Sequence, residues 1–464
     1  MKFSRLDNNE SPAAWVDAQL SALRSVPAAR KEHAFALHFS YFQTYLPSQP
    51  ALDLVALIHV DVTSGLPVIH LGVFNTTDQL IADIQLLRDD WMSIRQFSTA
   101  NHLPVFQVSA PWELVPVYIP KPWGQEIWFT GIEARGQAAV KCDEGSIPLP
   151  WILAVFPQAE RSLILLKVLD PLPDEVYGDL YFELHEEKQE VYVVTSINED
   201  AWPDGTGSIQ LGFSPDKRGN YTDDHEFKKA YLEAVKSYEQ VRRTLDKKID
   251  DLRSPSSTTL STLQLKNWIN TLSQSPENEA LIQSERNLRS LMNSFVNHMP
   301  LVVGDTVAIP RCVPHALQHG VRVVEFQTPV YERQILSFAQ KVVTQDHWDT
   351  EKALAIAEMD YVFQSPARLV SNDQIDVELI VSFDDFLVQR IHLKAGFCYE
   401  PSVLDYSLVM LIAGELRLVW SGGQRILAAG NSMLIPKSME GRYYFAAEDS
   451  CLFLHALPKA FDQV

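Results

Sequence analysis

Three side chains that can bind a metal ion lie close together within residues 178–194. Glu183 and His185 fall in a strand-like segment, where residues two positions apart point to the same face, so both can face one cavity. A β-branched and aromatic segment begins at Val191, and a hairpin return can bring Glu190 opposite them. One imidazole and two carboxylates suit a first-row divalent metal, with a position left for water or substrate.

The spacing of these residues resembles the first motif of the cupin barrels, whose leading ligand is usually His or Gln and is here Glu183. A second cupin motif should follow, with the form G-D-x-x-x-x-P and a histidine a few residues later. Gly304-Asp305, Pro310 and His315 supply it. The two motifs together predict four metal ligands: Glu183, His185, Glu190 and His315. Taken singly, each residue has a structural alternative, as a satisfied core histidine or as part of a solvated hairpin tip.

Length and charge limit the possible classes of protein. A chain of 464 residues is expected to form two or three domains. Its net charge of −20 argues against nucleic acid or an anionic membrane as a partner, although a pocket can still be locally basic. The four cysteines lie far apart without C-x-x-C spacing, which fits a reducing compartment. The N-terminus lacks an apolar run of signal-peptide length, so we expect a cytoplasmic protein.

The residues outside the ligand motifs predict a mainly β fold with helical insertions: two cupin (jelly-roll) barrels, an α-helical block and an N-terminal α/β domain. We expect the N-terminal α/β accessory domain in residues 1–112. One predicted helix begins near Pro12, and two more cover Ala28–Tyr45 and Asp78–Phe97. The predicted strands are Leu52–Val62 and Leu66–Phe74. His59 and His70 lie in these apolar strands and are expected to be packed residues.

Residues 113–220 and 299–372 are expected to form the metal-binding barrel, with an early strand at Trp151–Phe156. A helical insertion, 221–298, interrupts this barrel, and its predicted helices cover residues 223–252, 258–273 and 278–297. A short helix is expected near residues 350–359. Residues 373–464 read as short strands separated by glycine-containing turns, which is typical of a sandwich or barrel. This C-terminal barrel lacks the ligand set and is predicted to hold no metal.

Residues 115–460 resemble the type I phosphomannose isomerases, over about three-quarters of the chain. Four stretches carry the resemblance: Lys121–Gly124, Leu165–Asp170, the run from Gly304 to His315 with Glu325-Phe326-Gln327 behind it, and Glu351–Leu354. The resemblance implies a zinc-dependent aldose–ketose isomerase, or one using another divalent metal, that converts mannose 6-phosphate to fructose 6-phosphate or acts on a related sugar.

The resemblance also implies roles for residues. The family's metal ligands fall on Glu183, His185, Glu190 and His315. Its substrate-contacting lysine falls on Lys188, and its catalytic arginine and its glutamate fall on Arg333 and Glu325. Lys121 and Arg311 are further cations that could contact a sugar phosphate. Two departures stand out, because Glu183 replaces a neutral Gln and the loop between the His and Glu ligands is much shorter.

Two alternatives to an isomerase follow from the same residues. One is a non-catalytic carbohydrate-binding or regulatory cupin that retains the metal for structure. The other is a cupin oxygenase, which would favour iron and two or three histidine ligands, so that the two carboxylates count against it. An isomerase needs an open metal position and at least one cation facing it, which separates it from the first alternative.

Overall fold

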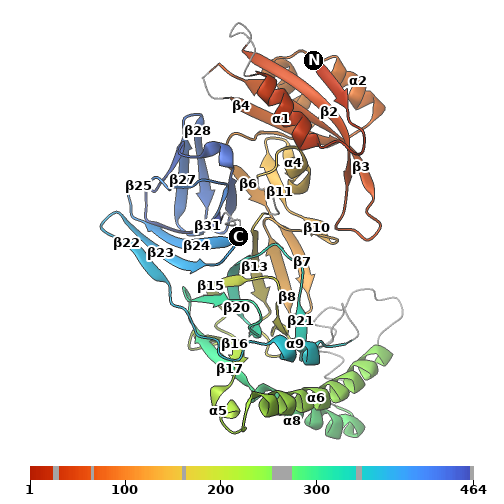
Figure 1. Ribbon diagram of the computed structural model, residues 1–464, viewed down its shortest axis with the longest axis vertical. Helices are drawn as coiled ribbons and strands as arrows, with labels where there is room; N and C mark the ends of the chain where they lie inside the picture. Colours follow the sequence, from red (N-terminus) through yellow and green to blue (C-terminus); the bar gives the residue numbers. More distant parts are fainter. Residues whose placement is uncertain (24–30, 64–66, 159–162, 253–273, 341–346, 460–464) are drawn as a thin grey trace. The chain divides into compact units, whose positions relative to one another are not determined.

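The computed structural model describes residues 1–464 except 24–30, 64–66, 159–162, 253–273, 341–346 and 460–464 (Figure 1). The chain forms two compact units. The first joins residues 1–117 and 128–166 to 366–464, and the second joins 118–127 to 167–365. Within the described ranges, no helix has both the length and the apolar character needed to cross a membrane.

A five-stranded sheet in the order β1-β2-β3-β4-β5 forms the N-terminal part of the first unit. Its strands are β1 (Lys2–Arg5), β2 (Glu32–Phe42), β3 (Ala51–Asp61), β4 (Val68–Asn75) and β5 (Val105–Gln107). The accompanying helices are α1 (Pro12–Leu23), α2 (Asp78–Gln85) and α3 (Trp91–Ala100). Ala34 and Ala36 share a core with Ile84 and Ile94 of the helices α2 and α3. On the other face of β2, Phe35 contacts Trp15 of α1, with ring centroids 5.6 Å apart.

Three predictions of local structure in the first unit are wrong. The predicted helix over 28–45 is strand β2 where it is described, and the predicted strand over 151–156 is helix α4 (Leu149–Val155). Residues 151–156 are a short apolar run, whose helical and extended forms periodicity does not distinguish. The 11 residues of β2 are held extended by pairing with β3 along their whole length. The single helix predicted over 78–97 is two helices, because the Asp90 side chain accepts a hydrogen bond from the Ser93 N–H and caps the start of α3.

The rest of the first unit contains a nine-stranded sheet in the order β12-β11-β6-β29-β26-β31-β24-β23-β22 and a four-stranded sheet in the order β25-β30-β27-β28. The strands of the nine-stranded sheet are β6 (Trp112–Val115), β11 (Ala139–Cys142), β12 (Gly145–Pro148), β22 (Ala367–Ser371), β23 (Ile375–Ser382), β24 (Phe386–Leu393), β26 (Ser407–Ala413), β29 (Ser432–Ile435) and β31 (Cys451–Pro458). Those of the four-stranded sheet are β25 (Cys398–Tyr399), β27 (Glu415–Trp420), β28 (Gly423–Ala428) and β30 (Tyr443–Ala446). Residues of both sheets, among them Leu411 and Phe445, share one core.

The second unit contains a six-stranded sheet in the order β18-β15-β20-β13-β8-β7 and a five-stranded sheet in the order β17-β16-β19-β14-β21. The first comprises β7 (Val117–Lys121), β8 (Gly124–Trp128), β13 (Leu165–Pro171), β15 (Glu190–Ile197), β18 (Thr306–Ile309) and β20 (Val321–Gln327). The second comprises β14 (Phe182–Leu184), β16 (Gly207–Phe213), β17 (Val296–Leu301), β19 (His315–Leu317) and β21 (Gln334–Ser337). Val194 and Val323 of one sheet share a core with Ile209 and Leu317 of the other.

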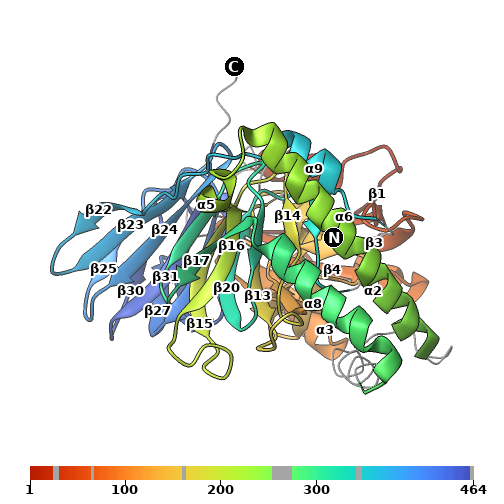
Figure 2. The ribbon, with the colours of Figure 1, turned by 90° about the horizontal axis from the view of Figure 1, so that it is seen from below.

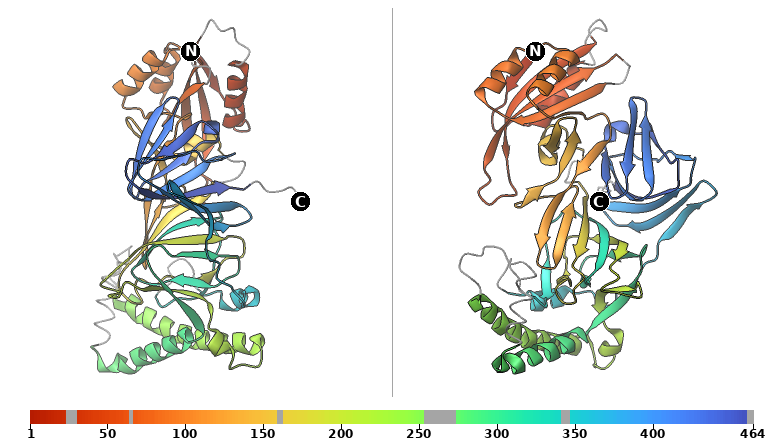
Figure 3. Two further views of the ribbon diagram at one scale, coloured as in Figure 1. Left: turned by 90° about the vertical axis from the view of Figure 1, so that its left-hand side faces the viewer. Right: turned by 180° about the vertical axis from the view of Figure 1, so that it is seen from behind.

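Helices cover the outer face of the five-stranded sheet. They are α5 (Pro215–Arg218), α6 (Asp224–Leu252), α8 (Glu279–Asn293) and α9 (Thr350–Ile356). Phe182 and Leu184 of β14 share a core with Tyr231 of α6 and Met292 of α8. Helices α6 and α8 lie side by side in the views of Figures 2 and 3. Short elements complete the chain: β9 (Ile132–Glu133), β10 (Gly136–Gln137) and the 3₁₀ turns at Pro276–Asn278 and Lys437–Met439.

The helical block differs from its prediction in detail. The helix predicted over 278–297 ends at Asn293, since the residues after it form β17 and pair with β16. The helix predicted over 258–273 lies outside the described residues. The mainly β fold class is confirmed, whereas the two-barrel architecture and the four domain boundaries stay predictions. Strands β6, β11 and β12, from the stretch assigned to the metal-binding barrel, belong to the nine-stranded sheet.

Acidification should destabilise the first unit partly through His455. Its imidazole is completely buried beside Phe445, and burial lowers its pKa to about 4. This pKa is lower in the folded than in the unfolded chain, so protonation of His455 favours unfolding. The folded state keeps its full stability above about pH 6.5 and loses part of it as the pH falls. Between about pH 7.5 and pH 5, wild type should lose about 2 kcal/mol more of its unfolding free energy than His455→Leu.

Urea unfolding at the two pH values measures this difference. A matched control is His102→Asn, since His102 is exposed and Asn tolerates its backbone φ of 52°. Equal pH dependence in wild type and His455→Leu would contradict the prediction.

Candidate metal centre

Two adjacent strands of the five-stranded sheet and one strand of the six-stranded sheet supply the predicted metal ligands. Glu183 of β14 lies directly opposite His315 of β19 in the antiparallel ladder, and His185 follows β14 by one residue. Glu190 is the first residue of β15. The two sheets face each other across a shared core, so these side chains meet between them.

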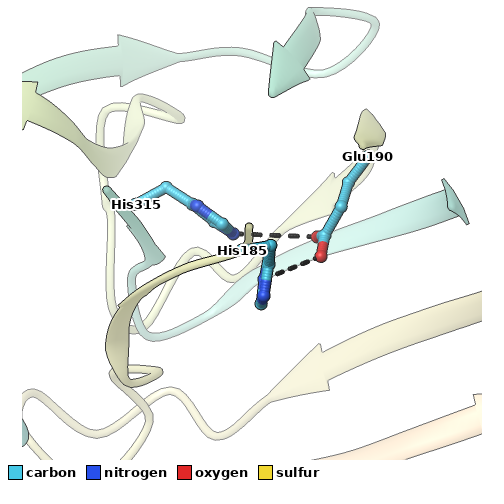
Figure 4. Close-up of side chains that lie close together, drawn as sticks. All are labelled: His185, Glu190 and His315. Atoms are coloured by element: carbon cyan, nitrogen blue, oxygen red, sulfur yellow. Dashed lines mark ion pairs between the residues drawn. The ribbon is translucent and has the colours of Figure 1, made fainter. Parts of the chain in front are cut away.

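His185, Glu190 and His315 converge on one point (Figure 4). Nε2 of His185 lies 2.9 Å from Oε1 of Glu190, and Nε2 of His315 lies 3.7 Å from Oε2 of the same carboxylate. All three side chains are buried, and one ligand atom from each lies within 4.8 Å of the others. Within the described ranges these are the only three histidine, cysteine or carboxylate side chains grouped closely enough to hold a metal.

The hydrogen bonds of the two rings fix which nitrogen faces the carboxylate. Nδ1 of His185 lies 2.9 Å from the Glu332 carbonyl oxygen, and Nδ1 of His315 lies 3.0 Å from that of Val313. Carbonyl oxygen only accepts, so Nδ1 carries the proton and donates in both rings. Both Nε2 atoms therefore turn lone pairs toward Glu190. Burial lowers the pKa of His185 to about 4, aided by Lys188, which keeps its ring neutral. Lone pairs facing a buried carboxylate suit a divalent cation between them.

Glu190 is the most heavily contacted of the three residues. Lys188 Nζ lies 2.7 Å from its Oε1, and the Tyr192 hydroxyl donates to its Oε2 at 2.9 Å. Burial opposes ionisation of Glu190, but the ammonium of Lys188 outweighs it and holds the pKa of this carboxyl well below its ordinary range. Glu190 is thus a carboxylate at neutral pH, oriented by Lys188 and Tyr192 at the oxygens that face the two rings.

Glu183 lies beside the three converging side chains. Its Oε1 is 3.8 Å from His185 Nε2, and its Oε2 is 3.6 Å from the Arg333 guanidinium. Arg333 also lies over the Tyr181 ring, 4.6 Å from its centroid. Burial would lower the pKa of Arg333, but the carboxylate of Glu183 and the Tyr181 hydroxyl raise it. The arginine is therefore close to the predicted metal ligands and carries its charge there.

A second buried charge cluster continues along the six-stranded sheet. Lys167 of β13 lies 3.1 Å from Glu325 of β20 and 4.0 Å from Glu126 of β8, and Lys121 lies 3.2 Å from Glu126. Burial raises the pKa of Glu325 to about 8, although the ammonium of Lys167 opposes this. Glu325 pairs with Tyr192 in the ladder between β20 and β15, and Gln327, two residues further along β20, pairs with Glu190. The two clusters therefore adjoin.

The remaining predicted cation, Arg311, is exposed and donates from Nε to the Glu187 carbonyl oxygen at 3.1 Å. It lies against the short loop between the His and Glu ligands. The same loop is held by Glu332, whose Oε2 accepts from the N–H groups of Glu186 and Glu187 at 2.8 and 3.2 Å. Residues 331–333 thus fix the loop, orient the His185 ring and place Arg333.

Sequence reasoning missed four residues that contact the predicted site: Glu126, Lys167, Tyr181 and Tyr192. Two of them could have been identified from the sequence. Lys167 is the one charged residue in the apolar run Ser162–Leu169. Tyr192 is two residues from Glu190 on the same strand and so must share its face. Glu126 and Tyr181 gave no comparable signal, since their partners Lys121 and Arg333 are recognised only in the fold.

The comparisons with known proteins bear on the fold. No family model and no curated protein matches the chain. Among solved structures, the mannose 6-phosphate isomerase of Bacillus subtilis superposes with a TM-score of 0.51 at 14% identity, covering 75% of this chain and 99% of that one. An arginine-to-alanine variant of the phosphomannose isomerase of Salmonella typhimurium superposes with a TM-score of 0.51 at 12% identity, covering 76% of this chain and all of that one.

The similarity covers the full length of those enzymes and about three-quarters of this chain, the same share over which the motifs resemble the family. At this identity the motifs and the superposition agree on the architecture. The chain therefore has the fold of these two solved isomerases.

Proposed function

We propose that this protein is a metal-dependent aldose–ketose isomerase acting on a hexose or a hexose phosphate. The proposal rests on the arrangement of His185, Glu190 and His315, in which the Nε2 atoms of two oriented imidazoles face one ionised carboxylate. Glu183 supplies the fourth ligand in this proposal. The bound ion, zinc or another first-row divalent metal, would act as a Lewis acid that stabilises the oxyanions of an enediol.

The replacement of a neutral ligand by Glu183 is compatible with this chemistry because each carboxylate has its own cation. Lys188 compensates Glu190 at 2.7 Å, and Arg333 compensates Glu183 at 3.6 Å. The four side chains together carry no net charge, so the charge of a bound divalent ion is not cancelled. Because each proposed ligand carboxylate has a cation beside it, a bound divalent ion would remain electrophilic.

Isomerisation moves a proton between C1 and C2 of the sugar, which requires a base. We assign this role to Glu325, since burial raises its pKa to about 8 and brings it into the range suited to proton transfer. Arg333 is assigned to the developing oxyanion, while Lys188, Lys121 and Arg311 are the candidate contacts for substrate. Lys188 and Lys121 already pair with Glu190 and Glu126, so a substrate group would share or replace those pairs.

One observation favours the alternative of a carbohydrate-binding cupin without catalysis. Lys188 Nζ contacts the same oxygen of Glu190 that faces His185. An ammonium there supplies part of the charge compensation that a metal would otherwise give. If the protein holds no metal, the buried carboxylate is still paired with Lys188, and the site would bind a sugar without catalysis.

His315→Ala should remove both the metal and the activity. The substitution deletes one of the two imidazole lone pairs that face Glu190. We expect wild type to hold one zinc per chain and to convert mannose 6-phosphate to fructose 6-phosphate, with metal content and turnover both falling at least tenfold in the variant. Elemental analysis and a coupled assay measure the two quantities.

The control is His347→Ala, which changes an exposed histidine. Zinc in wild type without activity on any hexose or hexose phosphate would favour the binding protein. Wild type without metal would contradict the four-ligand site.

Glu183→Gln should weaken metal binding and strengthen the bound ion as an electrophile. Removing one negative charge beside His185 lowers the attraction for a divalent ion, and we expect zinc affinity to fall roughly tenfold. Turnover per bound zinc should rise, because one negative charge fewer beside the ion leaves it a stronger electrophile. A chelating-dye competition measures the affinity, with Glu187→Gln, an exposed neighbour, as the matched control. Unchanged affinity would place Glu183 outside the coordination sphere.

Glu325→Gln should lower kcat by about a hundredfold or more while zinc content stays unchanged. Because the carboxylate is the active form, activity in wild type should rise with pH through the Glu325 pKa of about 8. Lys167→Met should move that inflection to higher pH, since it removes the ammonium that opposes the raised pKa. A pH profile of kcat/KM that is the same in wild type and Lys167→Met would exclude Glu325 as the base.

A further inference from the structure

We propose a second ligand site, remote from the metal centre, that binds a phosphorylated sugar or sugar alcohol. It is a cavity of about 390 Å³ between the outer face of the five-stranded sheet and helix α8. Its lining comes from β14, β16, β17, β21, α8 and the loops around residues 175–180, 202 and 318–319. Cavities of this volume accommodate small organic ligands.

The alternation of side chains separates this cavity from the metal centre. Gln210 lines the cavity, whereas its neighbours Ile209 and Leu211 lie in the core between the two sheets, on the side of His315. On β14, Phe182 lines the cavity and the next residue, Glu183, faces His315 and Arg333. Successive residues of a strand point to opposite faces, so the cavity and the metal ligands lie on opposite faces of the same sheet.

The floor of the cavity is polar although it is almost inaccessible to solvent. Gln210, Gln318 and Ser337 are 8, 7 and 5% exposed and all line it. Gln318 donates from Nε2 to the Ala316 carbonyl oxygen at 3.0 Å, which turns its amide oxygen away from that contact. Packing a helix on a sheet needs apolar side chains at such positions, as at the neighbouring Phe182 and Met292. Polar side chains at the base of a cavity provide hydrogen bonds that orient a hydroxylated ligand.

An aromatic wall stands beside this floor. The Trp202 ring stacks on the His319 ring at 4.8 Å, and its indole N–H donates to the His319 carbonyl oxygen at 2.7 Å. Both residues line the cavity together with Phe338. His319 is itself held by Asp179, which accepts from its N–H and Nδ1 at 3.0 and 2.7 Å. A fixed ring pair gives an apolar surface against which the carbon skeleton of a sugar can lie.

Both signs of charge lie at the mouth of the cavity: the arginines Arg286 and Arg289, and the exposed carboxylate of Glu175. Arg286 and Arg289 are three residues apart on α8 and so extend from the same face of the helix. Arg289 pairs with Glu285 at 3.4 Å, but Arg286 is exposed and has no carboxylate within ion-pair distance in the described part of the chain. The lining also includes Asp179, whose other oxygen accepts from the Val176 N–H at 3.1 Å. The Arg286 guanidinium above a polar floor favours phosphate, which it can bind through paired hydrogen bonds.

The test is calorimetric titration of the full-length protein with glucitol 6-phosphate, a hexose derivative without a carbonyl group that an isomerase could act on. We expect binding in wild type and in His315→Ala with the same affinity, and at least tenfold weaker binding in Arg286→Ala and in Gln210→Leu. Arg243→Ala, an equal change of charge on α6 away from the cavity, is the control and should bind as wild type does. Arg286 is exposed, so its substitution should leave the fold intact.

Other outcomes overturn the proposal. Binding that is lost in His315→Ala and unchanged in Arg286→Ala would place the ligand at the metal centre only, without bearing on whether that centre is catalytic. Equal affinity for glucitol would remove the role of the phosphate, and equal affinity for inorganic phosphate would remove that of the sugar. No binding to wild type would leave the cavity without this class of ligand.

Discussion

The carboxylate of Glu190 is the interaction on which the candidate site depends. It is buried between two sheets beside the rings of His185 and His315, and it stays ionised because Lys188 and the Tyr192 hydroxyl contact its oxygens. A buried carboxylate without partners would be strongly destabilising. The positions of Lys188 and the two rings are therefore tied to that of Glu190, and the local geometry of β14, β15 and β19 serves to bring them to one point.

The short loop between the ligands gains its shape from a distant segment. Residues 186 and 187 donate to Glu332, whose backbone also accepts from His185, and Arg311 donates back to the loop. A longer loop would carry its own internal contacts, whereas this one relies on the segment that also places Arg333. The orientation of the His185 ring and the position of the Arg333 guanidinium are thus coupled through one three-residue stretch.

The sequence allowed the convergence of His185, Glu190 and His315 to be predicted because their positions follow local rules. Glu183 and His185 share a face by the strand period, and the spacing to Glu190 and His315 matches two known motifs. The fold class followed from the many short strands, whereas the apolar runs that became β2 and α4 were ambiguous since either form buries them. The pairing of Arg333 with Glu183 joins residues 150 positions apart, and the cavity beside Gln210 depends on how α8 packs. Neither has a local signal.

Similarity of fold and identity of chemistry rest on different parts of this chain. The sheets require apolar side chains of suitable volume at alternate positions, which many sequences satisfy, so a shared fold at 12–14% identity needs few shared residues. The buried charges are different. Replacing paired ions by apolar residues of similar volume is often neutral or stabilising, so the packing does not require Lys167, Glu325, Glu190 and Lys188. Four such groups on one wall, beside two buried imidazoles, are better explained by chemistry at that wall than by stability.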